Sequence, residues 1–120
     1  MKTSDRRILT THAGSLPRTD TLARMLIERD HGRPVPEGEL RREIEVATDW
    51  VVARQLESGV DIGSDGEEAR VGFQTYASVV AEDVVWAKLQ VLAEGARIVS
   101  RRLKRAKVAK TRPGKPRRRR

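Results

Sequence analysis

The sequence predicts an α/β fold, in which short extended segments alternate with amphipathic helices. Residues 8–11, Ile-Leu-Thr-Thr, form a compact β-prone run that stops before Gly14 and Pro17. Residues 60–63 form a second short run, which begins after Gly59 and leads into an acidic turn. The order strand, loop, helix, helix, strand, loop is typical of folds in which consecutive strands lie parallel and helices cover them.

Three helices are expected around these two strands. The first is predicted over residues 20–29, the second from about residue 37 to a stop at Gly59, and the third over residues 81–103. Each repeats apolar side chains every three or four residues, which is the period of one helix face. In the third helix this stripe comprises Trp86, Leu89, Ala93, Ala96 and Val99.

The positive charge is concentrated at the C-terminal end. Residues 101–120 hold 12 of the 25 Lys and Arg residues and no Asp or Glu, so residues 1–100 keep 13 basic against 17 acidic residues, a net charge of −4. Residues 104–120 lack periodicity and contain two prolines and a glycine. We expect a disordered basic tail there, because such a segment cannot bury enough apolar surface to offset its ordering entropy.

The composition also indicates the cellular location of the protein and whether it contacts a membrane. The chain has no cysteine, which excludes disulfides, thiolate metal ligands and cysteine nucleophiles. This usage favours a cytoplasmic location. No apolar run approaches the roughly 18 residues that cross a bilayer, so no membrane partner is expected. A length of 120 residues leaves room for one domain.

Two motifs resemble the cobalamin-independent methionine synthase family. Residues 10–18, Thr-Thr-His-Ala-Gly-Ser-Leu-Pro-Arg, are similar to the family's opening strand and loop. Residues 59–62, followed by Asp-Gly-Glu-Glu-Ala-Arg at residues 65–70, resemble its second strand and Gly-Glu-x-x-Arg loop. Parts of residues 85–103 resemble the family's terminal helix.

The resemblance implies a partial (β/α)8 TIM-barrel fragment that is mostly helical. Residues 1–78 would supply the first strands and helices, residues 79–103 the terminal barrel helix and residues 104–120 the disordered basic tail. A complete barrel typically needs about 250 residues, so the intervening strands would be missing and the chain would be internally truncated.

The resemblance also implies a chemistry. The family uses zinc to transfer the methyl group of 5-methyltetrahydropteroylglutamate to homocysteine, or to a related thiol, in methionine biosynthesis. Its zinc ligands are a His, two Cys and an acidic residue, and none is recognisable here; His12 and His31 lie in separate loops. Without zinc the thiol stays mostly protonated, although the thiolate is the nucleophile. We therefore expect an inactive member of the family, with no catalytic and no metal-binding residue.

Three residues match the family's substrate site. The resemblance implies that Gly14 and Ser15 bind the amino-acid part of homocysteine and that Glu67 contacts its ammonium group. A carboxylate in a partly buried site would make a charge-assisted hydrogen bond to that group. The residues by themselves leave a second interpretation open, in which Gly14 and Ser15 form an ordinary tight turn and Glu67 lies in a solvated acidic turn.

Charged residues next to these positions allow two roles. Arg18 and Arg70 could each bind an anion, or could pair with Asp65 or Glu68. We favour the structural pairing, because arginine and carboxylate side chains in adjacent loops commonly satisfy each other.

Two other function classes remain open. A basic-tailed module could contact nucleic acid or an acidic protein through residues 101–120, although the absence of aromatic residues there favours a solvated appendage without a partner. A helical interaction fragment could dock apolar stripes around Leu40 and Trp86 onto a relative or a second copy, which would give self-association. In a truncated barrel, several apolar residues would lack full partners, namely Val51, Val52, Leu56, Trp86, Leu89 and Leu92.

Overall fold

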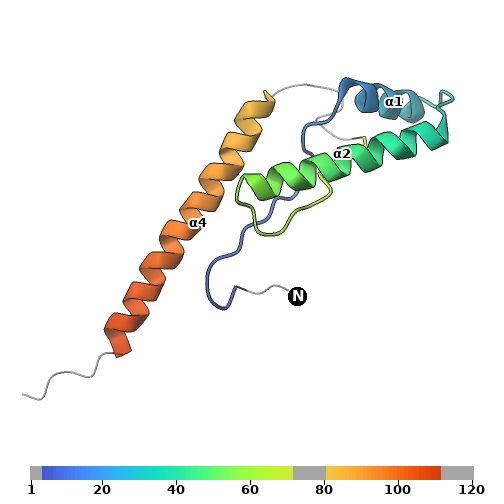
Figure 1. Ribbon diagram of the computed structural model, residues 1–120. Helices are drawn as coiled ribbons and strands as arrows, with labels where there is room; N and C mark the ends of the chain where they lie inside the picture. Colours follow the sequence, from blue (N-terminus) through green and yellow to red (C-terminus); the bar gives the residue numbers. More distant parts are fainter. Residues whose placement is uncertain (1–3, 72–80, 112–120) are drawn as a thin grey trace, which may run out of the picture.

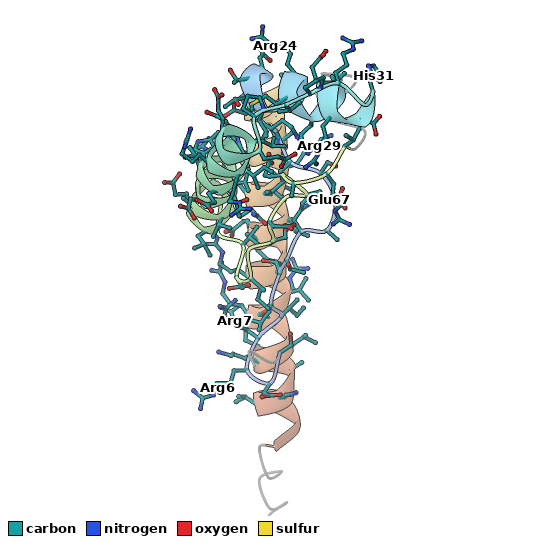
Figure 2. The ribbon with its side chains drawn as sticks, turned by 90° about the vertical axis from the view of Figure 1, so that its right-hand side faces the viewer. Arg6, Arg7, Arg24, Arg29, His31 and Glu67 are labelled. Atoms are coloured by element: carbon teal, nitrogen blue, oxygen red, sulfur yellow. The ribbon has the colours of Figure 1, made fainter. Side chains whose placement is uncertain are left out.

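The structure is a computed structural model, and it describes residues 4–71 and 81–111 of the chain. The described residues form the helices α1 (Asp20–Asp30), α2 (Glu37–Glu57) and α4 (Glu82–Thr111). As Figure 1 shows, α1 and α2 lie side by side, while α4 begins beside them and extends well beyond the pair. The extended N-terminal segment passes beneath α2 and runs along the far half of α4 (Figures 1 and 2).

The expected α/β sheet does not form in residues 4–71 and 81–111, and the partial (β/α)8 barrel fragment was the wrong fold class. The two segments predicted as strands meet at a single parallel bridge between Thr11 and Ile62. The carbonyl of Thr10 accepts from the N–H groups of both Asp61 and Ile62, at 3.0 and 3.1 Å. The N–H of Thr10 donates to the Asp61 carboxylate at 2.9 Å. Because a side chain occupies a position that a ladder gives to a backbone carbonyl, the pairing does not continue. The expectation of a mostly helical chain is confirmed.

The ends of α1 and α2 follow from local sequence. Thr19 caps α1, since its Oγ1 accepts from the N–H of Leu22 at 3.2 Å. Pro36 precedes α2, where a missing N–H costs no helical hydrogen bond. The two helices pack through a first core cluster of buried side chains, which comprises Leu22, Leu26, Leu40 and Ala47.

A second core cluster joins α4 to the rest of the molecule. It consists of Leu16, Val51, Val60, Trp86 and Leu89. The rings of Trp50 and Trp86 lie edge to face, with centroids 5.5 Å apart. Three residues that were expected to lack partners, Val51, Trp86 and Leu89, are therefore buried, whereas Leu56 and Leu92 are exposed.

The helix α4 is longer than the sequence pattern predicted. It continues to Thr111, although a disordered tail was expected from residue 104. Lys, Arg and Ala dominate residues 104–111, and these are strong helix formers that need no burial to continue an existing helix. The expected boundary between residues 78 and 79 and the last part of the tail, residues 112–120, lie outside the described residues.

Candidate functional site

Two loops that follow the extended segments, residues 12–18 and 64–70, meet at one place. The N–H of Leu16 donates to the carbonyl of Gly66 at 2.9 Å, and the Leu16 side chain is fully buried. Gly66 has a φ of 62°, and a Cβ atom at this position would lie 2.9 Å from the Cβ of Leu16. A side chain at residue 66 would therefore separate the loops, so glycine allows their close contact.

Ser15 and Glu67 come together at this contact. The Ser15 hydroxyl donates to Oε2 of Glu67 at 2.8 Å, although the residues are 52 positions apart in the chain. The Glu67 backbone has a φ of 57°, which costs a non-glycine residue roughly 1–2 kcal/mol. Backbone strain of this kind is concentrated at binding and catalytic sites. We call these two residues, with the loops that carry them, the Ser15–Glu67 site.

The guanidinium of Arg18 holds the second loop in place. Its Nη1 donates to the carbonyl of Arg70 at 2.8 Å and its Nη2 to the carbonyl of Glu67 at 3.2 Å. The side chain is almost completely buried, and its Nε lies 3.7 Å from Oε2 of Glu68. Arg18 therefore points into the protein, where its charge lies beside the Glu68 carboxylate.

The remaining predicted residues lie at the rim of the site. Arg70 is exposed, and its Nη2 lies 3.7 Å from Oε1 of Glu67. Asp65 accepts from the backbone N–H of Glu67 at 3.0 Å, which closes the turn before that residue. Gly14 has a φ of 109°, a conformation that favours glycine, and it directly precedes Ser15. The site thus presents a hydroxyl, a carboxylate and one exposed guanidinium.

Glu68 has a larger structural role than its sequence suggested. Its side chain is 0% exposed, and among the described residues neither carboxylate oxygen has a hydrogen-bond partner. Burial raises the pKa of Glu68 to about 7, while the charge of Arg18 opposes this rise and the charge of Asp65 adds to it. No signal in the sequence indicated this burial, because two consecutive carboxylates on a turn can both face solvent, as the adjacent Ala69 and Arg70 do.

Gln55 also supports the site, although it lies in neither of the two sequence motifs. From α2, its Nε2 donates to the carbonyl of Ser64 at 2.8 Å, and its Oε1 accepts from the N–H of Ser64 at 3.0 Å. The Gln55 side chain is fully buried and also donates to the carbonyl of Val51. A polar residue on the otherwise apolar stripe of α2 was the signal for this link between the helix and the site.

Asp61 fixes the other side of the second loop. Its carboxylate accepts from the N–H of Thr10 and pairs with the guanidinium of Arg7. The Arg7 hydrogen bond lowers the pKa of Asp61 to about 2, with Thr10 contributing, so this group stays ionised at neutral pH. The start of the loop is thereby tied to the N-terminal segment.

The residues present do not fit the zinc site that the resemblance implies. In residues 4–71 and 81–111, no three His, Cys, Asp or Glu residues come together in a way that could hold a metal ion. His12 is partly buried beside Gly14, and His31 is exposed at the end of α1. The same part of the chain contains no helix with the length and apolar character needed to cross a membrane.

Comparison with known proteins identified no relative of this chain. A scan against protein-family models and searches of curated proteins and of solved structures found no match to this chain. The function must therefore be argued from the Ser15–Glu67 site and from the surfaces around it.

Proposed function

We propose that this chain is a methionine-synthase-like protein that binds the amino-acid part of homocysteine, or of a related small thiol, without transferring a methyl group. The observation that carries the proposal is the contact between Ser15 and Glu67 at 2.8 Å. Two residues from separate motifs, both matched to substrate binding by the resemblance, are neighbours in the fold.

The chemistry of the site suits a zwitterion. Glu67 can accept charge-assisted hydrogen bonds from an ammonium group. When the ammonium group replaces Ser15 as the donor to Glu67, the Ser15 hydroxyl can donate to the carboxylate of the ligand instead. Arg70 is exposed beside Glu67 and supplies a positive charge for the same carboxylate. The two ends of an amino acid would each meet a complementary group.

We propose binding without methyl transfer because the described part of the chain lacks residues that would activate the thiol. The chain has no cysteine, and the described residues contain no cluster that could hold zinc. A thiol near its unperturbed pKa of about 8.5 is mostly protonated at neutral pH and is a poor nucleophile. We assign no residue to 5-methyltetrahydropteroylglutamate, and the proposal concerns the thiol acceptor only.

Titration calorimetry with L-homocysteine should detect binding that requires both ends of the amino acid. Glu67→Gln should weaken affinity at least tenfold, because a hydrogen bond to a charged group contributes about 1.5–3 kcal/mol. Ser15→Ala should weaken it by about twofold to tenfold, because a neutral hydrogen bond contributes about 0.5–1.5 kcal/mol. Glu57→Gln is the matched control, since Glu57 pairs with Arg54 on the exposed surface of α2.

Two ligands separate this proposal from a general affinity for thiols. L-Methionine keeps the amino-acid group and should bind, whereas 3-mercaptopropionate lacks the ammonium and should not. Equal binding of 3-mercaptopropionate and homocysteine, or unchanged homocysteine affinity in Glu67→Gln, would refute the proposed role of Glu67.

A further inference from the structure

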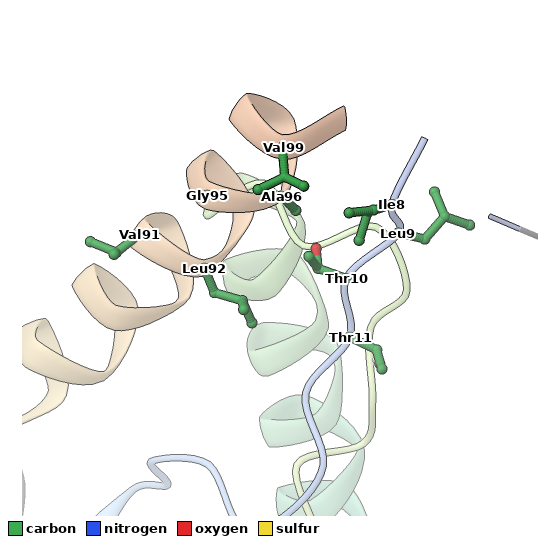
Figure 3. Close-up of a pocket in the computed structure, with 9 residues that line it drawn as sticks. All are labelled: Ile8, Leu9, Thr10, Thr11, Val91, Leu92, Gly95, Ala96 and Val99. Carbon is green, nitrogen blue, oxygen red and sulfur yellow. The ribbon is translucent and has the colours of Figure 1, made fainter. Parts of the chain in front are cut away.

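An apolar groove of about 520 Å³ lies between residues 8–11 of the N-terminal extended segment and α4, next to the point where the N–H of Ile8 donates to the Ser100 hydroxyl of α4 at 2.9 Å. Figure 3 shows Ile8 and Thr10 pointing from the extended segment toward the helix, with Ala96 and Val99 on the facing side of α4. None of residues 12–18 or 64–70 line this groove, so it is distinct from the Ser15–Glu67 site. The Ser15–Glu67 site therefore does not account for this groove.

The α4 wall of this groove has the spacing of a helix–helix seam. Leu89, Leu92, Ala96, Val99 and Leu103 follow one another at alternating intervals of three and four residues, which is the repeat that packs one helix against another. Leu89 is buried in the second core cluster, but Leu92, Val99 and Leu103 are 47%, 42% and 51% exposed. Beyond Leu89, no helix of the described residues covers the seam.

Positive charge surrounds the exposed half of the seam. Residues 97–107 contain six Lys and Arg residues, and no Asp or Glu follows Glu94 in the sequence. Ile8 also borders a second, smaller hollow, which is lined by Arg6 and Lys104 together with Asp5. In Figure 2, Arg6 lies beside the far half of α4. The apolar groove therefore opens onto a cationic end.

The apolar seam and the positive charge around it together indicate what kind of molecule the groove binds. A second copy that laid its own exposed half of α4 on this groove would bring six cations against six, and like-charge contacts of this kind are unfavourable. Nucleic-acid phosphates would use the cations but would leave Leu92, Val99 and Leu103 in water. An amphipathic helix with an acidic polar face would cover the apolar stripe and neutralise the cations at once.

We propose that the groove between residues 8–11 and α4 binds an acidic amphipathic helix of a partner protein. The apolar face of that helix packs on Leu92, Val99 and Ile8, and its carboxylates lie toward Arg6 and Lys104. Residues 8–11 border the groove on the other side, and because the N–H of Ile8 donates to the Ser100 hydroxyl of α4 at 2.9 Å, the bound helix lies over the groove and not between its walls.

Fluorescence anisotropy with two labelled peptides tests the proposal on the full chain. The first probe is an 18-residue helical peptide with Leu at alternating spacings of three and four and Glu on its other faces. The second has the same composition in an order that breaks the apolar stripe. The first peptide should bind at least about tenfold more tightly than the second, because only the first buries an apolar face.

Variants on the surface distinguish the groove from general charge attraction. The double variant Val99→Glu, Leu103→Glu places charges on exposed positions of α4 and should weaken binding of the first peptide at least tenfold. Val46→Glu is the matched control, because Val46 is 67% exposed on α2 and faces no groove residue named above. The double variant Arg6→Ser, Lys104→Ser should weaken binding more at low salt than at high salt.

Four results would overturn the proposal. Equal affinity for the two peptides, or unchanged affinity in the Val99, Leu103 variant, would show that the groove takes no helix. Tighter binding of a 20-base-pair DNA duplex, unaffected by the same variant, would make the surface a phosphate-binding one. Light scattering that finds a dimer dissociated by that variant would assign the groove to a second copy. Circular dichroism of each variant must show unchanged helicity for these comparisons to count.

Discussion

Raising the pH from 5 to 8 should lower the free energy of unfolding by about 2–3 kcal/mol, because Glu68 must ionise inside the folded protein. The pKa of Glu68 in the folded protein is about 7, whereas the ordinary pKa of a glutamate is 4.5. The folded state therefore holds the proton more strongly, and stability falls as pH rises through this interval, by about 1.4 kcal/mol for each pKa unit. Urea unfolding followed by tryptophan fluorescence at pH 5, 6, 7 and 8 measures this slope.

Glu68→Gln should remove most of that pH dependence, because the amide keeps the shape of the side chain and does not titrate. Glu57→Gln, on the exposed surface of α2, should leave the slope unchanged. Asp61, with a lowered pKa of about 2, acts in the opposite sense and only in more acidic solution, since its contribution is lost as pH falls below about 4. A free energy of unfolding that stays level between pH 5 and 8 would rule out a raised pKa of Glu68 in the folded state.

Gln55→Ala should lower the free energy of unfolding by about 2–4 kcal/mol, because it removes a fully buried side chain and leaves polar groups of Ser64 without their partner. The second loop should loosen with it, so homocysteine affinity should fall as well. Gln90→Ala on the exposed face of α4 is the matched control and should change stability by less than about 0.5 kcal/mol.

Chemical denaturation with Trp86 as the reporter measures the effect, because this residue is 2% exposed and stacks edge to face with Trp50. A Gln55→Ala protein as stable as the parent would mean that water satisfies Ser64 and that α2 does not hold the site loop.

Helix positions could be predicted well because their signals are local. The first helix was expected over residues 20–29 and runs over Asp20–Asp30, and the third was expected from residue 81 and begins at Glu82. Caps and apolar periodicity act over one or two turns, so the sequence carries them directly. The far end of α4 was missed because its basic composition resembles a disordered tail, whereas helix propensity continues through it.

The sheet was predicted wrongly because pairing depends on partners distant in the chain. Residues 8–11 and 60–62 are adjacent, as expected for neighbouring strands, but only Thr11 and Ile62 form a bridge. The Asp61 side chain takes the N–H of Thr10, and no third segment among the described residues extends the pair. A β-prone run indicates an extended backbone, but it does not determine whether a ladder forms.

The sequence by itself determined the positions of the helices, the charge at the C-terminal end and the identity of Ser15, Glu67 and Arg18 as residues of interest. Only the tertiary structure decided that Ser15 and Glu67 are hydrogen-bonded, that Glu68 is buried and that Gln55 holds the second loop. The physical reason is that these contacts join segments up to 52 residues apart. Which of two adjacent carboxylates faces inward depends on the positive φ of Glu67 and on the packing of Leu16 against Gly66, and neither is encoded in local propensity.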